Sequence, residues 1–470
     1  MFENRSPESQ QEFWIETRRL PQATASTFYR KLDETLEAIG FTAGVRELCL
    51  PAYADASRGG RPGIDPAVYF KMLMIGFFEN LPSERAIASR CADSLSLRAF
   101  LGYGLEESTP DHSSLSVIRS RLGTAIYQTA LELVLRGLRE HGLLKGRHLG
   151  IDSSVIEANA SLRELVHRNT EEHYWEYVKR LAAEAGIDPD DTKAVRRFDK
   201  KREGRTTSNK EWVNPHDPDA KTGVTKHGAF DMIYKPEHVT DLETGVIVAA
   251  QVRCGDEGDT TDLAVRVLAA GETLARVCED TRQTKVLTSL TADEGYFAVE
   301  EVGCLQADRV RVVIGDPHAA KRKVSRQDGI VRGVLANARR AVKSKSGKAL
   351  LRKRGEHLER SFCHVLDHGC LRRATLRGRE NLTKRQLGGA LAYNLSLLMR
   401  HLTGQGTPKQ WLASACAVVA WAMGVLLAWI DGHIAEMSRG KRLCAHGPPI
   451  AGFLQVILRL DRMAGFSTGC

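Results

Sequence analysis

The segment from residue 148 to residue 314 constrains the fold most, because short apolar strands alternate there with amphipathic helices. The stretch MIYKPEHVTDLETGVIVAAQVR predicts two β-strands joined by the turn DLETG, which ends at Gly245. A strand at RHLGIDSS precedes this hairpin. After it, LAVRVLAAGETLARV predicts a helix, and VLTSLTADEGYF and VRVVIGDP each predict a strand. A mixed sheet with helices on its faces, an α/β fold, is the natural solution for this order.

The remainder of the 470 residues suggests two further parts. Apolar residues spaced by three and four from Asp65 to about Gly123 predict an all-helical N-terminal domain at 1–125, and its arginines favour either DNA docking or an ordinary solvated face. Residues 126–400 then form the α/β domain. A polar stretch at 162–226, which begins with the amphipathic helix EEHYWEYVKRLAAEAGID, is expected to be an insertion. Residues 401–470 are expected to be a C-terminal helical tail.

Charge is distributed unevenly along the chain. Lys and Arg number 67 against 58 Asp and Glu, a formal net charge of +9, and residues 309–380 hold 20 Lys/Arg but only 6 Asp/Glu. A basic field of this kind favours a polyanionic partner, because neutralising phosphates releases counterions. A solvated charged surface is the alternative interpretation of such a run.

Cysteine usage and the N-terminus favour a reducing cytoplasm. The ten cysteines contain no C-x-x-C spacing, which argues against a zinc ribbon and against a disulfide scaffold. The N-terminal stretch MFENRSPESQQEFW has no apolar region typical of a signal peptide. We therefore expect no secretion.

The segment WLASACAVVAWAMGVLLAWI, residues 411–430, has twenty residues without a charge. That length meets the requirement for spanning a bilayer. Its alanines, Ser414 and Gly424 are equally at home in a packed core or an oligomer interface. We expect a buried helix here, with a membrane-associated protein as the alternative.

Two aspartates lie on neighbouring strands of the predicted sheet. Asp152 is at the centre of the half-buried strand predicted in GIDSSVIEANAS, and Asp293 ends the strand of LTADEGYF, where an open α/β sheet gathers its ligands. Carboxylates that converge in this way suit Mg²⁺, which takes one or two of them and keeps its waters or accepts phosphate oxygens. Each aspartate has a plainer interpretation as a turn residue, since an unpaired carboxylate near a core is costly.

A third carboxylate is expected from the helix GEHLERSFCHVLDHG, residues 355–369. Its apolar face comprises Leu358, Phe362, Val365 and Leu366. Glu359 lies at the border of that face, and Glu356 competes for the same role. The plainer interpretation of Glu359 is a surface ion pair with Arg360 or Arg354. Trp212 and Tyr296 are candidates either for stacking on a displaced base or for packing.

The motifs GIDSSVIEANAS, LTADEGYF, ERSFCHVLDHGCLRRATLRGRENLTKRQL and ALAYNLSLLMR, in this order, resemble those of the DDE transposases of bacterial insertion sequences. The helical stretch GIDPAVYFKMLMIGFFENLPSERAIASRC resembles the N-terminal transposase domain that accompanies them. The resemblance covers roughly residues 40–400. It implies an RNase H-like catalytic domain, with Asp152, Asp293 and Glu359 as the three catalytic, metal-binding acids.

The resemblance also implies chemistry and partners. Two Mg²⁺ ions, which Mn²⁺ is expected to replace, would serve phosphodiester cleavage at transposon ends and transfer of the freed 3′-hydroxyl into target DNA. The implied partners are terminal inverted repeats, target DNA and a second copy of the chain in a dimer or higher assembly, with a bacterial, nucleoid-associated location. Many relatives carry Tyr and Arg before the third acid and Lys after it, whereas Gly355 and Leu366 stand at the nearest positions here. Nearby arginines are therefore expected to contact DNA, namely Arg352, Arg354, Arg360, Arg372, Arg373 and Arg377.

Alternative functions remain open at this point. A metal-dependent nuclease of the same fold would cut DNA without joining it. A decayed relative would bind DNA without any chemistry, although the presence of all three acids argues against decay.

Overall fold

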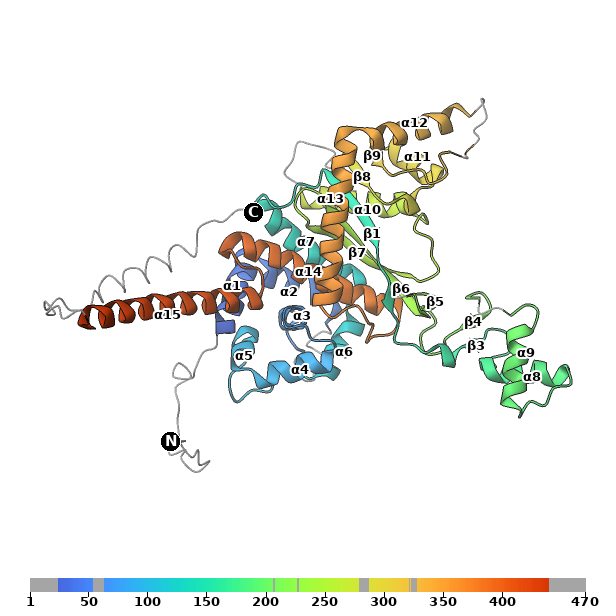
Figure 1. Cartoon of the computed structure of the whole chain (residues 1–470), viewed down its shortest axis with the longest axis horizontal. Coiled ribbons are helices and arrows are strands. Elements are labelled where there is room, and N and C mark those ends of the chain that lie inside the picture. Colours follow the sequence, from blue (N-terminus) through green and yellow to red (C-terminus); the bar gives the residue numbers. More distant parts are fainter. Residues whose placement is uncertain are drawn as a thin grey trace.

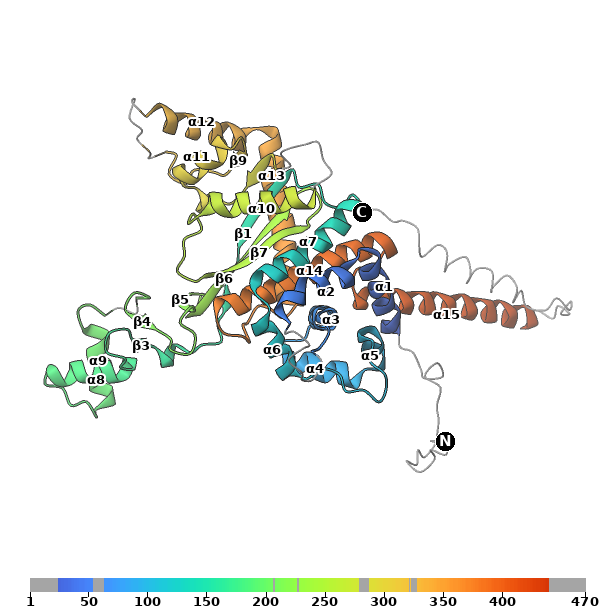
Figure 2. The ribbon, with the colours of Figure 1, turned by 180° about the vertical axis from the view of Figure 1, so that it is seen from behind.

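The structure is a computed structural model, and it describes residues 24–53, 63–205, 208–225, 228–278, 287–320, 322 and 328–438. Over these residues the chain is a mixed α/β protein with a helical N-terminal region, as predicted (Figure 1). Two parts extend from the body, one around α8 and α9 and the other formed by α15 (Figures 1 and 2).

The N-terminal region is built from short helices with polar caps. Asp65, Ser83, Ser94 and Asp111 each accept a hydrogen bond from a backbone N–H in the first turn of the helix that follows. The helices are α1 (Thr24–Ala38), α2 (Phe41–Cys49), the 3₁₀ turn η3 (Leu50–Ala52), α3 (Pro66–Phe78), α4 (Glu84–Asp93), α5 (Leu95–Leu101), α6 (His112–Arg121) and α7 (Thr124–Glu140).

The main sheet has the strand order β7-β6-β1-β8-β9. Strand β6 is antiparallel to both β7 and β1, whereas β8 is parallel to β1 and β9 is parallel to β8. The predicted hairpin is confirmed as β6 and β7, with Gly245 at φ 80° in the turn between them. The strands are β1 (His148–Ser153), β2 (Ile156–Glu157), β5 (Lys221–Val224), β6 (Phe230–Asp241), β7 (Ile247–Cys254), β8 (Ser289–Thr291) and β9 (Arg311–Val313), with β2 and β5 also pairing with β6.

Helices cover the two faces of this sheet (Figures 1 and 2). Helix α13 lies close to β1, because Gly150 has no side chain: a Cβ there would come within 3.2 Å of Leu358 Cδ1. Helix α10 covers the other face. The covering helices are α10 (Leu263–Val277), α11 (Val299–Ala307), α12 (Gly329–Lys343) and α13 (Lys345–Phe362), which continues as the π-helical turn η7 (Cys363–His368).

Helix α14 (Arg379–Thr403) protects the free edge of β7. The Asn394 side chain accepts a hydrogen bond from Ile247 N at 2.9 Å and donates one to Ile247 O at 2.8 Å. The Thr383 hydroxyl accepts a third bond from Val252 N. These side chains replace a missing strand, which explains why the buried Asn394 belongs in the motif ALAYNLSLLMR.

One hydrophobic core joins the helical region to the sheet. It extends from Phe28 in α1 to Met399 in α14 and includes Tyr127 of α7 and Leu290 of β8. Because α14 packs on α3, α7 and β7, the two predicted domains share an apolar interior. The boundary near residue 125 remains a prediction.

The predicted insertion contains more regular structure than its polar sequence indicated. It comprises η5 (Leu162–Glu164), β3 (Val166–His167), α8 (Tyr174–Glu184), α9 (Thr192–Lys201) and β4 (Trp212–Val213). Val178, Ala182 and Val195 form a small separate core, and the buried Asp199 carboxylate accepts a bond from Tyr174 Oη at 3.0 Å. Because this core is so small, its apolar periodicity is weak.

Helix α15 (Pro408–Ser438) overturns one prediction. We expected residues 411–430 to be buried, but Leu412, Trp421 and Leu427 are at least half exposed, since the helix projects away from the body (Figure 1). Over the described residues, no single helix is long and apolar enough to cross a membrane. The pair Arg379–Ser414 and Val419–Ile430, bent by 41°, meets that test by length and composition.

Candidate active site

Asp152 and Asp293 lie at the carboxyl ends of two neighbouring parallel strands. Strand β1 carries Asp152 one residue before its end, and Asp293 follows the last residue of β8 by two positions. Gly150 pairs with Thr291 across the two strands, so both aspartates leave the sheet at the same edge. The structure thus brings together two of the three predicted acids.

Arg354 of α13 lies between these carboxylates. Its Nη2 is 2.7 Å from Asp152 Oδ2, and its Nη1 is 4.0 Å from Asp293 Oδ1. The exposed fraction of the side chain is 16% for Arg354, 26% for Asp152 and 67% for Asp293. One cation therefore spans a half-buried carboxylate and an open one.

Electrostatics explain why the Asp152 position is costly. Burial raises the pKa of Asp152 above its ordinary value, and the nearby Asp293 carboxylate raises it further. Arg354 and the hydrogen bond that Ser153 N donates to Asp152 Oδ1 at 2.9 Å act in the opposite direction. The ionised carboxylate is therefore incompletely compensated, and an additional cation would stabilise it.

Glu359 does not join this pair. It is exposed and lies five residues after Arg354, which is about 140° further round α13. Glu356 is also exposed, and it pairs with Arg360 at 2.8 Å. Within the described parts of the chain, no group of three His, Cys, Asp or Glu side chains is arranged to hold a metal ion. The role of Glu359 remains a prediction.

The donor set fits one Mg²⁺ better than two. Asp152 and Asp293 supply two carboxylates, which is the number Mg²⁺ takes from protein when waters and phosphate complete its shell. A second ion requires a further carboxylate, and neither Glu356 nor Glu359 faces the pair. Arg354 occupies the space between the two aspartates and would compete with the cation.

A buried charge network lies on the opposite face of the sheet, and the sequence analysis did not identify it. Glu237 of β6 is 1% exposed and accepts bonds from Arg266 Nη1 at 2.6 Å, Gln251 Nε2 at 2.8 Å and Tyr296 Oη at 3.3 Å. Tyr296 belongs to η6 (Glu294–Tyr296), the turn directly after Asp293. The network therefore ties the Asp293 turn to β6 and α10. The interruption of an apolar strand by a glutamate was its only signal in the sequence.

The network also reaches the end of β1. Ser153 Oγ donates to Asp259 Oδ1 at 3.3 Å, and Arg253 Nη1 lies 3.5 Å from the same oxygen. Tyr296 and Trp212, which we considered for base stacking, are both buried. In this structure they pack instead.

The predicted DNA-binding arginines fall into two groups. Arg352 and Arg373 are exposed, although Arg373 lies 3.9 Å from Glu157. The other four contact protein, although Arg360 and Arg377 are also exposed: Arg354 bridges the acids, Arg360 pairs with Glu356, and Arg377 donates to Asn159 O. Arg372 donates to Ser154 Oγ at 2.9 Å and pairs with Asp367 at 2.8 Å, so it fixes the chain just beyond Asp152.

Comparison with known proteins adds one finding. Residues 18–121 match the family model of a transposase domain (DUF772). This span contains α1 to α6 and lies outside the acid pair. The match supports a transposase of an insertion sequence. The comparison with curated proteins and the comparison with solved structures gave no match.

Proposed function

We propose that the protein is a DDE-type DNA transposase whose sheet domain has an RNase H-like fold. The observation that carries this proposal is the convergence of Asp152 and Asp293 at the ends of two parallel strands, in a chain that also contains a transposase domain. The order β7-β6-β1-β8-β9, with only β6 reversed among β6, β1, β8 and β9, is the topology we expect of that fold.

The acid pair is proposed to hold Mg²⁺, with Mn²⁺ as a substitute. When bound, the metal would polarise a phosphodiester and stabilise charge on its oxygens. Asp152 provides a carboxylate that burial has partly removed from water. Arg354, beside both acids, is placed to contact a phosphate oxygen once it is released from Asp152. The chain's own contribution is to position the phosphodiester between these groups.

A DNA-binding relative without chemistry is the second candidate. It is favoured by the Arg354 guanidinium between the two carboxylates and by the outward direction of Glu359. In that case the ion pair would be a permanent structural feature, and a metal would not displace it.

Incubation of the purified chain with duplex DNA carrying the ends of its own element tests the proposal. We expect Mg²⁺-dependent cleavage that exposes a 3′-hydroxyl, followed by joining to a target duplex, and loss of both steps in EDTA. Cleavage without joining would identify a nuclease. Binding without cleavage in Mg²⁺ or Mn²⁺ would identify the non-catalytic relative.

Variants of the two glutamates locate the third acid. Glu359→Gln is expected to abolish both steps, and Glu356→Gln to leave them unchanged. The reverse result would transfer the role to Glu356. If both variants remain active, the third acid does not come from α13.

A further inference from the structure

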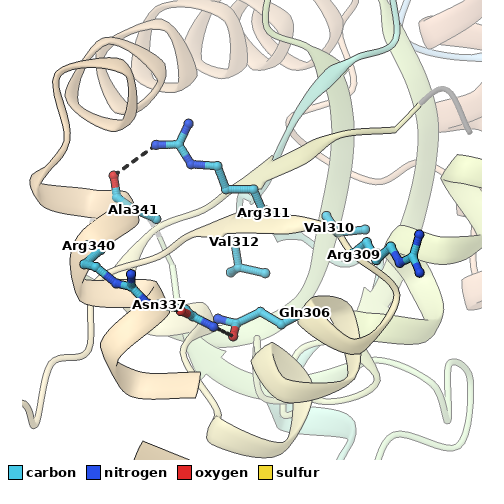
Figure 3. A pocket seen from close by; sticks show the side chains of 8 residues that line it. All are labelled: Gln306, Arg309, Val310, Arg311, Val312, Asn337, Arg340 and Ala341. Carbon is cyan, nitrogen blue, oxygen red and sulfur yellow. Dashed lines mark hydrogen bonds between the residues drawn. The ribbon is translucent and has the colours of Figure 1, made fainter. Parts of the chain in front are cut away.

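A basic hollow lies beside β9, at the edge of the sheet away from β7. It has a volume of about 430 Å³ and is bounded by α11, the turn before β9, β9 itself and α12 (Figure 3). Arg311 extends from β9 toward Ala341 of α12, and Arg309 extends from the other end of the hollow (Figure 3). The hollow does not contain Asp152, Asp293 or Arg354.

Among the described residues that line this hollow, three are arginines and none carries a carboxylate. Arg309, Arg311 and Arg340 are exposed, and none forms an ion pair with any residue that the structure describes. Three uncompensated guanidinium groups around one depression repel one another, so an anion that enters is stabilised by all of them.

Neutral groups fix the directions of two of these arginines. Arg311 Nη2 donates to Ser344 Oγ at 2.7 Å. Arg340 Nη2 donates to Asn337 Oδ1 at 2.6 Å, and Asn337 in turn donates to Gln306 at 3.1 Å. Hydrogen bonds to hydroxyl and amide oxygens orient the guanidinium groups and leave their positive charge intact.

The basic surface continues from the hollow along α13. Ser344, the partner of Arg311, is the N-cap of this 18-residue helix, so the positive end of the helix dipole adds to the field. Lys345, Lys348 and Arg352 are exposed at spacings of three and four, which places them on one face of α13. From Ser344 to Arg352 the helix covers about 12 Å, roughly the axial length of three to four base-pair steps.

We propose that the hollow and this face of α13 bind the sugar–phosphate backbone of duplex DNA at a site separate from the acid pair. The inference rests on the proposed function for the nature of the substrate. A polyanion fits better than a nucleotide, because no aromatic side chain lines the hollow to stack on a base and the cations extend well beyond it. Contacts of this kind position the duplex without reading its sequence.

The salt dependence of DNA binding tests this site. Affinity for a mixed-sequence duplex of about 30 base pairs is measured in EDTA by fluorescence anisotropy over a range of KCl concentrations. The triple variant Arg309→Gln, Arg311→Gln, Arg340→Gln is compared with Arg30→Gln, Arg197→Gln, Arg400→Gln. The latter arginines are exposed and form no ion pair within the described chain. Both triple variants remove the same charge.

For the hollow variant, we expect the slope of log K against log salt concentration to be shallower than that of the wild type by roughly two to three units. The control variant should lose less than one unit, and the triple Lys variant at the hollow should recover the wild-type slope. Equal losses in the two Gln triples, or no loss at the hollow, would overturn the proposal. The single variant Arg309→Gln controls for misfolding, because the Arg309 side chain makes no hydrogen bond among the described residues. For this variant the slope should be shallower than that of the wild type by about 0.9.

Two further measurements distinguish a duplex site from a free-anion site, and the hollow from the acid pair. Inorganic phosphate at 10 mM, compared with chloride of equal ionic strength, should not displace the duplex; specific displacement would assign the hollow to a free anion and overturn the proposal. Binding is measured without metal, so a wild-type chain that binds through the hollow but never cleaves would refute the proposed chemistry alone. If the wild type cleaves DNA and the hollow variant keeps the wild-type salt slope, only the proposed DNA site at the hollow would be refuted.

Discussion

At the residue scale, the site is defined by how one arginine and two aspartates share charge. Asp152 is a half-buried carboxylate whose pKa is raised by burial, and Arg354 partly offsets that cost. The arrangement explains how an acid is accommodated near the end of this half-buried strand. A metal ion bound at the pair would compete with Arg354 for the same oxygens.

Arg354→Gln is therefore expected to strengthen metal binding. Removing the guanidinium removes its repulsion toward an incoming cation, and we expect Mn²⁺ affinity to rise about tenfold, equivalent to about 1.4 kcal/mol. Titration calorimetry of the free chain with Mn²⁺ measures this, with Arg360→Gln as the matched control on the same helix. Weaker binding in Arg354→Gln than in Arg360→Gln would show that Arg354 supports the metal site.

His238 predicts a pH dependence of stability. It pairs with Asp152 across the strands, is fully buried, stacks on Phe362 and bonds Ser361 Oγ at 3.0 Å; burial lowers its pKa to about 3. The unfolded chain binds a proton near pH 6.5 and the folded chain does not, so this stability is present above pH 6.5 and lost as the pH falls toward 3.

Chemical denaturation at pH 7 and at pH 5 checks this expectation. The wild type should lose about 2 kcal/mol more between these two pH values than His238→Gln does. The exposed His318→Gln is the control and should match the wild type. If His238→Gln lost as much stability as the wild type, His238 would have to be protonated in the fold.

At the element scale, the Glu237 network holds the turns that carry the site. Its carboxylate joins β6 to α10, to β7 and to the η6 turn after Asp293. Arg266 is 11% exposed and pairs with Glu237 at 2.6 Å, whereas Arg253, 5% exposed, shares Glu237 with Glu257 and Asp259. The network stabilises the relative placement of β1 and β8.

Glu237→Ala is expected to lower the free energy of unfolding by about 3–5 kcal/mol, because it leaves the buried Arg266 without its ion-pair partner and removes one of the carboxylates beside Arg253. Urea denaturation followed by circular dichroism measures the loss. Glu243→Ala, which removes a more exposed ion pair with Arg147, should cost less than about 1 kcal/mol. Similar losses in the two variants would mean that the network contributes little.

Helix α15 leads to a second prediction at this scale. Its exposed Leu412, Trp421 and Leu427 project from the body, and large exposed apolar surfaces mark interaction sites. We expect this helix to form the interface of a dimer, so truncation after Gly404 should give a monomer in analytical ultracentrifugation. A truncated chain that stays fully oligomeric would exclude this role for α15.

The elements that sequence alone predicted are those with a strong local pattern. Alternating apolar residues and the DLETG turn define the β6–β7 hairpin, Asp152 lies within β1, and Asp293 follows β8. The sequence could not predict the direction of the Glu359 side chain. A residue at the border of an apolar face turns inward or outward with a small rotation of the helix. The Glu237 network joins residues from four separate segments, and no local pattern records such contacts.

At the scale of the whole molecule, one core connects the transposase domain to the sheet that carries the acids. Helices α3 and α7 pack on α14, and α14 closes the edge of β7. DNA bound at the basic hollow, as proposed, would therefore be presented to the acid pair by a continuous body. The insertion and α15 extend away from that body (Figure 2).

The most direct test compares wild type, Asp152→Asn and Asp293→Asn in Mg²⁺-dependent cleavage of DNA carrying the element's ends, with DNA affinity measured in parallel. We predict that the wild type cleaves and that each variant loses cleavage and joining while binding DNA as tightly as the wild type. Cleavage at the wild-type rate by either variant would contradict the assignment of the two aspartates as the catalytic pair.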